Sequence, residues 1–132
     1  MIKSINVKTR SRTEFVNITS EVQAIVTESG TDSGVCYIYV PHTTAGVTIN
    51  EGADPSVVTD IVSSLNKLIP HKANYLHMEG NSEAHIKTSL VGASECVIIE
   101  GGKLFLGTWQ AIFFCEFDGA RNRKVTVKVM EG

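Results

Sequence analysis

Polar residues follow directly after an apolar stretch in the first third of the chain. Residues 35–40 are almost wholly apolar, and Pro41, His42 and the pair Thr43-Thr44 come next. The end of a strand is a common place for functional side chains. His42 titrates near neutral pH and can therefore exchange a proton with a substrate. The segment ends in Asn50-Glu51, so His42 and Asn50-Glu51 are candidates for a catalytic site.

A second polar segment carries two of the four histidines. His77 and His85 lie eight residues apart, with Asn81 and two glutamates between them. This spacing is not the HExxH motif, which excludes a helical zinc-protease site. Histidine is the most frequent metal ligand, so His42, His77 and His85 would suit a metal site with an open position. The alternative is a surface loop with unrelated histidines, and His71 is expected to be merely exposed.

Two further segments lie near the C-terminus. The pair Trp109-Gln110 contains the only tryptophan, whose ring can stack on a heteroaromatic group, and an amide that needs a partner if it is buried. Arg121 and Arg123 alternate, so both point to one face of a strand. Two guanidinium groups on one face suit a phosphate or a carboxylate. Paired with Glu116 or Asp118 they would instead form a structural ion network, and spacing alone favours this second interpretation.

Apolar periodicity predicts the elements that must position these residues. Strands are expected over residues 2–9, 15–18, 34–40, the end of 42–51, 95–100, 104–117 and 124–130, with a break of the strand 104–117 at Gly107 left open. Helices are expected over residues 19–29, 55–69 and about 82–90. The first two strands are predicted to form a hairpin across residues 11–13, and the strand 34–40 to be buried on both faces. Asp54-Pro55 is typical of a helix start, and N-capping would explain Asp54 without a catalytic role.

The order of these elements predicts an α+β fold. Strands dominate and do not alternate regularly with helices, so a mixed β-sheet with two main helices is favoured over a doubly wound fold. A chain of 132 residues fits a single compact domain over residues 1–132. His42, Asn50 and His85 are expected to meet in one pocket of that domain.

The composition of the chain limits which classes of partner and which cellular compartment are expected. The formal net charge of −2 offers no positive field for nucleic acid or an anionic membrane, and no apolar run approaches the ~18 residues of a membrane span. The N-terminus has no signal-peptide pattern. The three cysteines stand in apolar segments without a CxxC pair, which indicates buried thiols in a reducing compartment. The expected location is therefore the cytoplasm.

Four motifs in sequence resemble the YjbQ-like family, also called the secondary thiamine-phosphate synthase enzyme family. They are Pro41 to Glu51 with Asp54, then Asn81-x-x-Ala84-His85, then Leu106-Gly107-Thr108-Trp109-Gln110, and finally Glu116-x-Asp118-Gly119 with Arg121-x-Arg123. Together they cover nearly the whole chain without large gaps. The resemblance implies an α+β subunit, usually in a homotrimer, with the polar motifs near a subunit interface.

The resemblance also implies an activity. The family label describes a weak or secondary thiamine-phosphate synthase, which joins an aminopyrimidine diphosphate to a thiazole phosphate and releases pyrophosphate. His42, His85 and Asn50-Glu51 would then be catalytic. The residues that would bind such a phosphorylated substrate are Thr43, Thr44, Asn81, Trp109, Gln110, Arg121 and Arg123.

The cofactor and two other functions stay open at this point. A divalent cation on carboxylate oxygens, such as magnesium, would help the two arginines to neutralise pyrophosphate. A histidine site on His42, His77 and His85 prefers zinc, which would fit a metal-dependent hydrolase instead. The third hypothesis is a trimer without catalytic activity that binds a small anion or metabolite.

Overall fold

The computed structural model describes residues 2–132, which form eight strands and three helices. The strands are β1 (Ile2–Lys8), β2 (Glu14–Asn17), β3 (Gly34–Tyr39), β4 (Ala45–Glu51), β5 (Ser94–Glu100), β6 (Lys103–Leu104), β7 (Gln110–Glu116) and β8 (Asn122–Glu131). The helices are α1 (Thr19–Ser29), α2 (Pro55–Leu68) and α3 (Ser82–Val91). The expected α+β class is confirmed, and α3 joins the two main helices as a third.

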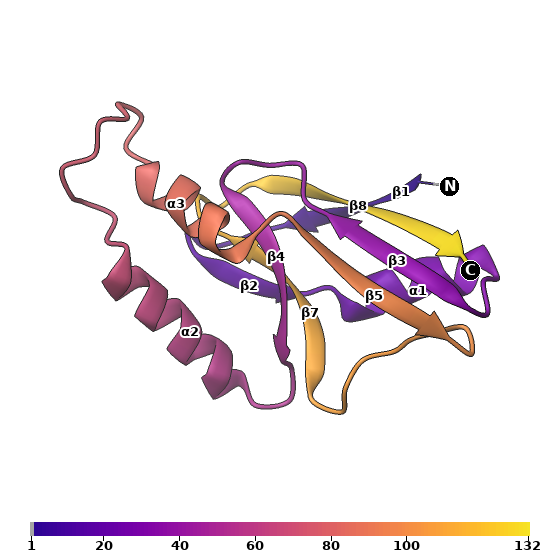
Figure 1. Cartoon of the computed structure of the whole chain (residues 1–132). Helices are drawn as coiled ribbons and strands as arrows, with labels where there is room; N and C mark the ends of the chain where they lie inside the picture. The colour runs from indigo at the N-terminus through magenta and orange to yellow at the C-terminus, as the bar shows by residue number, and fades with distance from the viewer. Residues whose placement is uncertain (1) are drawn as a thin grey trace.

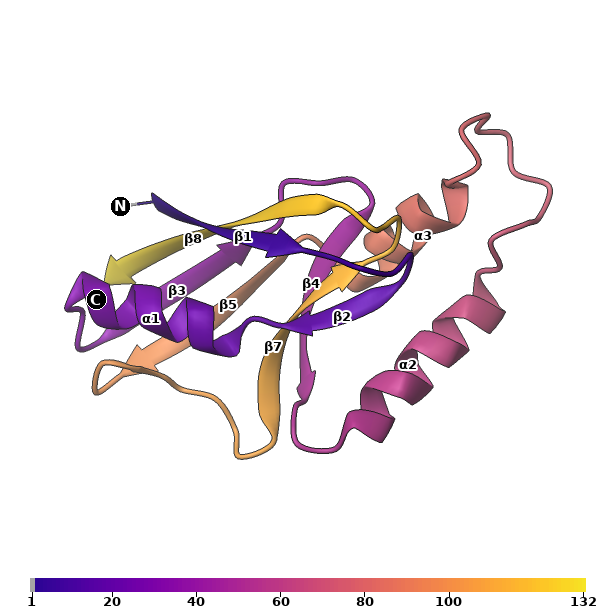
Figure 2. The same ribbon diagram turned by 180° about the vertical axis from the view of Figure 1, so that it is seen from behind.

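The strands form two sheets rather than one. The larger sheet has the order β1-β8-β3-β5-β6 and the smaller has the order β2-β7-β4, with every pairing antiparallel. Figures 1 and 2 show β4 and β7 running crosswise to β3 and β8. The chain passes from the smaller sheet to the larger between β7 and β8, at the Asp118-Gly119 turn. Polar residues from both sheets therefore meet at this crossing point.

The main core lies between the larger sheet, α1 and one face of the smaller sheet. Val22 and Val26 of α1 are fully buried there against Ile38 of β3 and Phe114 of β7. Because successive strand residues point to opposite faces, Phe113 belongs to a second cluster on the other face of β7. The three-stranded sheet thus has apolar side chains on both faces.

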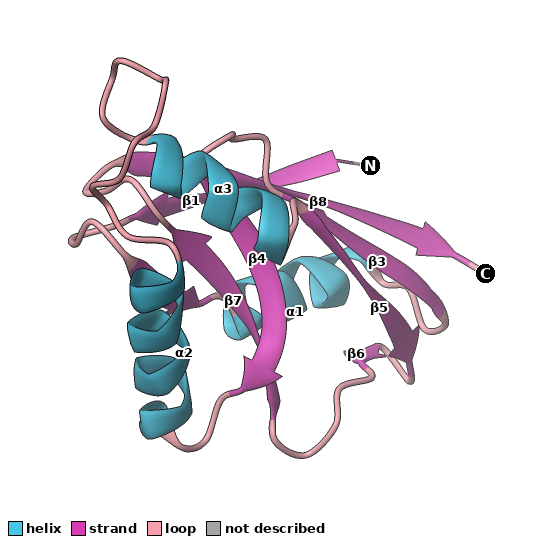
Figure 3. Cartoon of the chain, turned by 60° about the vertical axis from the view of Figure 1, so that its left-hand side comes forward, coloured by secondary structure: helices cyan, strands magenta, loops and turns pink. Residues whose placement is uncertain are grey.

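Helices α2 and α3 lie beside this second face of the smaller sheet (Figure 3). Asp54 caps α2 as expected, because its side chain accepts the backbone N–H of Ser56 at 2.9 Å and Pro55 follows. None of the residues of α2 is fully buried, whereas α3 buries Ala84. Helix α3 is therefore the better anchored of the two.

The predicted hairpin between the first two strands is wrong. Strand β1 pairs with β8, and β2 pairs with β7 in the other sheet. The segment between β1 and β2 does not form a hairpin turn, because its backbone bonds to distant residues. The backbone N–H of Thr9 donates to Arg121 O at 2.9 Å, and that of Gly119 donates to Arg12 O at 3.0 Å. These long-range bonds turn the chain from one sheet into the other.

The prediction that residues 34–40 are buried on both faces is also wrong. Strand β3 is central in its sheet, yet Tyr37 and Tyr39 are about half exposed on the outer face, where no helix among residues 2–132 covers them. Cys96, opposite Tyr37 on β5, shares this face and is exposed, whereas Cys36 and Cys115 are buried as expected. No helix within residues 2–132 is both long and apolar enough to cross a membrane.

Candidate functional site

A cavity of about 580 Å³ lies where β3 ends, β4 and β8 begin, and α3 starts. Seven of the residues singled out in the sequence line it: His42, Thr43, Thr44, Asn81, His85, Arg121 and Arg123. Tyr39, Glu79 and Asp118 complete much of the wall. The structure thus brings His42 and His85 to one hollow although they belong to different motifs.

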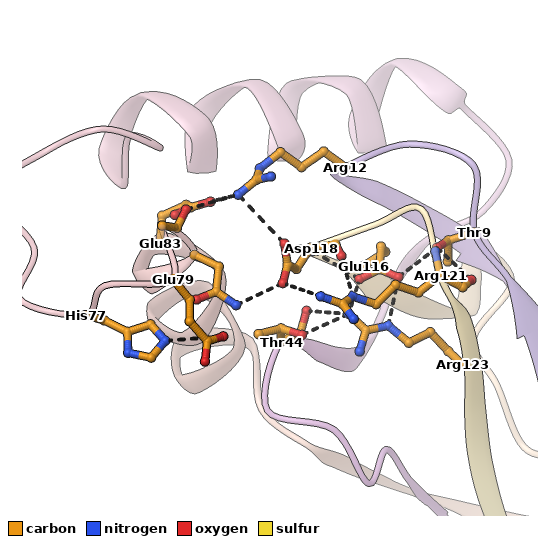
Figure 4. Close-up of polar contacts among 12 residues, drawn as sticks. Thr9, Arg12, Thr44, His77, Glu79, Glu83, Glu116, Asp118, Arg121 and Arg123 are labelled. Carbon is orange, nitrogen blue, oxygen red and sulfur yellow. Dashed lines mark hydrogen bonds and ion pairs between the residues drawn. The ribbon is translucent and has the colours of Figure 1, made fainter.

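A buried ion pair anchors one side of the cavity. Arg123 is only 6% exposed and Glu116 is fully buried, and the guanidinium binds both carboxylate oxygens through Nε and Nη2. Thr9 donates its hydroxyl hydrogen to Glu116 at 2.7 Å, and Thr44 accepts from Arg123 at 2.9 Å (Figure 4). Burial alone would raise the pKa of Glu116, but the hydrogen bonds from Arg123 and Thr9 outweigh it and hold the pKa below its ordinary value. This pair is a fixed part of the fold.

Arg121 is held more loosely, by Asp118. Its Nε donates to the backbone oxygen of Asp118 at 2.8 Å, and its Nη2 donates to the carboxylate at 3.0 Å. The side chain of Arg121 is 53% exposed. The same carboxylate oxygen accepts Asn81 Nδ2 at 2.9 Å. Burial would raise the pKa of Asp118, but the bonds from Asn81 and Arg121 outweigh it and lower the pKa.

The side-chain oxygen of Asn81 has no hydrogen-bond partner among residues 2–132. The residue lines the cavity but is only 9% exposed, and its Oδ1 is buried. Buried polar atoms are nearly always paired, so an unpaired one marks a place where polar contacts are incomplete. The cavity wall therefore has both a half-free guanidinium and an unfilled acceptor.

His42 is half-buried at the edge of the cavity and is fixed by β8. Its Nε2 lies 3.0 Å from the backbone nitrogen of Lys124 and 3.2 Å from the backbone oxygen of the same residue, so the backbone of β8 engages this ring nitrogen in either tautomer. Burial lowers the pKa of His42, and the nearby charge of Arg123 lowers it further. Because both backbone contacts engage Nε2, Nδ1 is the ring nitrogen that remains for a ligand.

The three-histidine metal site is not formed in this subunit. His77 and His85 lie edge to face with ring centroids 5.5 Å apart, and His77 faces Glu79 (Figure 4). His77 lies on a neighbouring hollow rather than on the wall that His42 shares with His85. Within residues 2–132, no three His, Cys, Asp or Glu side chains are arranged to hold a metal ion.

The other predicted site residues lie at the far end of β4 and β7. Glu51 is opposite Gln110 in the sheet register, and Gly52 N–H donates to Trp109 O at 2.8 Å. Their polar groups bond locally: Asn50 Oδ1 accepts the N–H of Glu51, and the exposed Gln110 accepts that of Gly107. Neither Asn50-Glu51 nor Trp109-Gln110 reaches the cavity within one chain, because β4 carries them away from His42.

Sequence reasoning missed the residues that connect the site to its surroundings. Arg12 Nη2 lies 2.6 Å from Glu83 Oε1 and 3.8 Å from Asp118 Oδ1 (Figure 4). His71, expected to be merely exposed, contacts the same Glu83 oxygen at 2.7 Å. Tyr39 supplies the cavity with an aromatic ring. The only available signal for Tyr39 was its place just before the Pro41-His42 motif.

Comparison with known proteins places the chain in a family. The model of the family described as UPF0047 protein YjbQ-like matches residues 3–132. The chain belongs to the YjbQ-like family. A UPF0047 protein of Methanocaldococcus jannaschii is 54% identical to this YjbQ-like protein over 130 residues, covering 98% of this chain and 94% of that one. UPF0047 protein YugU of Bacillus subtilis is 52% identical over 132 residues, covering 98% and 99% respectively.

A solved structure agrees with the fold. The uncharacterised YjbQ/UPF0047 protein of Clostridium acetobutylicum superposes with a TM-score of 0.96 at 52% identity, covering 97% of this chain and 99% of that one. The predicted family membership is therefore confirmed. These relatives are named for their family rather than for a reaction, so thiamine-phosphate synthase activity stays a prediction.

Proposed function

We propose that this YjbQ-like protein is an enzyme that binds a small phosphorylated molecule in the cavity between α3 and the ends of β3 and β4. The half-exposed guanidinium of Arg121 carries this proposal. Asp118 occupies its Nε and Nη2, while Nη1 has no partner among residues 2–132. A guanidinium held on one edge and open on the other suits a phosphate oxygen.

Neighbouring groups support recognition of such a ligand. His42 keeps Nδ1 free of the Lys124 backbone, and Thr43 is exposed at the cavity edge. Tyr39 takes the place first expected for Trp109, as a half-exposed ring on which a heteroaromatic group can stack. The cavity volume of about 580 Å³ suits a metabolite-sized ligand.

The reaction most consistent with these groups is the transfer implied by the family label. An aminopyrimidine diphosphate would place its leaving pyrophosphate beside Arg121, which neutralises charge as it develops. His85, whose ring lines the cavity and is not tied to the backbone as His42 is, is the candidate for acid–base work. The activity would be the weak or secondary thiamine-phosphate synthesis described above.

A divalent cation would enter with the substrate. Asp118 is occupied by Arg121 and Asn81, whereas Glu79 is mostly exposed on the cavity wall. Magnesium is commonly bound by one or two carboxylates together with substrate phosphates, and there it neutralises the leaving group. Glu79 would be its protein ligand.

Calorimetric titration with pyrophosphate tests binding at this cavity. We expect wild-type protein to bind, and Arg121→Gln and His85→Ala to weaken binding about tenfold or more, by loss of a charge-assisted contact and of a wall residue respectively. Both variants should melt near the wild-type temperature. Arg10→Gln, an exposed change away from the cavity, is the matched control and should bind as wild type.

Catalysis is tested separately. Purified protein incubated with the two phosphorylated precursors and magnesium should form thiamine phosphate, and His85→Ala should not. Binding of pyrophosphate without product formation would reduce the proposal to a metabolite-binding protein. Absence of binding by wild type would reject both.

A further inference from the structure

A second hollow lies between α3 and α2, with charged side chains in a largely apolar wall. Its volume is about 460 Å³, and Arg12, His71, Glu83 and Lys87 stand in its wall together with Asn66 of α2. Figure 3 shows α2 and α3 on the same side of the smaller sheet, with the loop 69–81 connecting them. Nothing in the proposed function uses this hollow.

Two oppositely charged residues of α3 are buried in its wall. Glu83 is 1% exposed and Lys87, four residues further on, is 3% exposed. Charged side chains are rarely buried to this extent unless their charges are fully paired. The contacts of each side chain decide whether this condition is met.

Glu83 uses only one of its oxygens. Oε1 accepts from Arg12 Nη2 at 2.6 Å and contacts His71 Nδ1 at 2.7 Å, while Oε2 is buried without a partner among residues 2–132. Burial would raise the pKa of Glu83, but the bonds from Arg12 and His71 outweigh it and lower the pKa. The carboxylate is thus ionised and is already bound to the Arg12 guanidinium and the His71 ring.

Lys87 is less completely satisfied. Its ammonium donates to Asn66 Oδ1, which is its only hydrogen bond within residues 2–132, although an ammonium has three hydrogens to donate. Burial lowers the pKa of Lys87, and the charge of Glu83 opposes this effect. A buried ammonium with two unused donors, at a hollow that also has the Arg12 guanidinium and the His71 imidazole in its wall, is an arrangement that an oxyanion can complete.

We propose that the hollow between α2 and α3 is a second ligand site, which binds a phosphate or carboxylate group on Lys87, Arg12 and His71. Arg12 and His71 are each about half exposed, so both can contact a ligand while keeping their bonds to Glu83. Asn66 would contribute a neutral contact from α2. Ligand bound here would link α2 to α3, which is notable because α2 has no fully buried residue of its own.

Titration of the full chain with inorganic phosphate, by calorimetry and ³¹P NMR, tests this site. Lys87→Met should weaken binding at the second site about tenfold or more, because the buried charge is removed. Lys67→Met is the matched control, since Lys67 is exposed on α2 outside the hollow. A parallel titration with acetate distinguishes the ligands: acetate competing equally with phosphate indicates a carboxylate site, and phosphate binding alone a phosphate site.

Crossed variants separate this site from the first cavity. Phosphate binding that survives Arg121→Gln and is lost in Lys87→Met supports the second site whatever happens to the proposed function. Binding that is lost in Arg121→Gln and unchanged in Lys87→Met overturns it. Lys87→Met removes a positive charge near the buried Glu83 carboxylate. The double variant Glu83→Gln, Lys87→Met removes both charges and should show the same loss of binding.

A crystal of the wild-type protein soaked in phosphate gives an answer that needs no variant. Electron density for an anion within hydrogen-bonding distance of Lys87 Nζ supports the site. A hollow that stays free of anion at saturating phosphate overturns it.

Discussion

Glu116 and Arg121 illustrate two kinds of charged residue at one cavity. Glu116 is fully buried and accepts hydrogen bonds from Arg123, Thr9 and the backbone of Asp118, so its position is fixed. Arg121 is half exposed and has donors to spare. A fixed ion pair orients the wall, and a partly free arginine beside it remains able to change partner when a ligand arrives.

Glu116→Gln should strongly destabilise the fold. The substitution leaves the guanidinium of Arg123 buried without its counter-charge, which typically costs about 3–5 kcal/mol of unfolding free energy. Urea unfolding of the purified variant measures this loss. Glu28→Gln is the matched control, because Glu28 pairs with Lys3 at the surface, where ion pairs contribute little. Equal stability of both variants would contradict a structural role for Glu116.

His42 should make stability depend on pH in a defined direction. Its folded-state pKa lies below the ordinary value of 6.5, so the unfolded chain binds more protons between these two pKa values. The contribution of His42 to the free energy of unfolding is fully present above pH 6.5 and is lost as the pH falls through the folded-state pKa. His42→Gln, which keeps an acceptor for Lys124 N–H, should remove this part of the pH slope. Unfolding curves from about pH 5 to pH 8 measure it, and parallel slopes for wild type and variant would refute it.

The sequence located much of the cavity because its residues occur in compact motifs at strand and helix ends. His42, Thr44 and Asn81 were found in this way. Arg12 and Lys87, which lie in the wall of the second hollow, were not found, because a charged residue in a loop or on a helix is ordinarily solvated, and only the fold shows that α3 buries Lys87. The ion pair of Arg123 with Glu116 was one of two interpretations that residue spacing left open, the other being a ligand site for a phosphate or carboxylate.

The turn between β7 and β8 has no room for a side chain at Gly119. A Cβ added at Gly119 would lie 2.2 Å from the backbone oxygen of Ser11 and 3.0 Å from Thr9 Oγ1. The close approach brings the segment after β1 against the polar network around Glu116. Glycine is therefore required here by packing rather than by backbone conformation.

Gly119→Ala should lower the melting temperature. Forcing the backbone of Ser11 away costs about 1–3 kcal/mol, as expected for overpacking, and disturbs the Thr9–Glu116 bond. Differential scanning calorimetry provides the measurement. Gly132→Ala is the control, because a Cβ there meets no atom within 4 Å. If Gly119→Ala melted like this control, the close packing of the turn would be disproved.

Element types were predictable from local patterns, but their pairing was not. Helix α2 shows a regular apolar spacing behind an Asp-Pro start, and Gly101-Gly102, a typical turn pair, joins β5 to β6. Strands β1 and β2, however, are close in sequence and enter different sheets. Their partners lie more than 90 residues away, at distances for which local periodicity carries no information.

For the whole molecule we predict a homotrimer, as the family resemblance implies. The outer face of the larger sheet agrees with burial in an assembly, since Tyr37, Tyr39, Ile98 and Met130 are all exposed on neighbouring strands. Multi-angle light scattering at micromolar concentration should give three times the chain mass. A monomer mass across that range would contradict the prediction. In that case Ile98→Glu, which places a charge on this face, would leave the measured mass unchanged.

The pairing of β1 with β8 affects how the protein folds during its synthesis on the ribosome. Strand β8 is hydrogen-bonded between β1 and β3, and Ile2 lies opposite Lys128. Until residues 122–131 have left the exit tunnel, β1 has no neighbour in its sheet, and one edge of β3 is unpaired. Such late, long-range closure slows folding and leaves strand edges exposed to other chains. Until β8 has emerged, the nascent chain therefore exposes strand edges that favour aggregation.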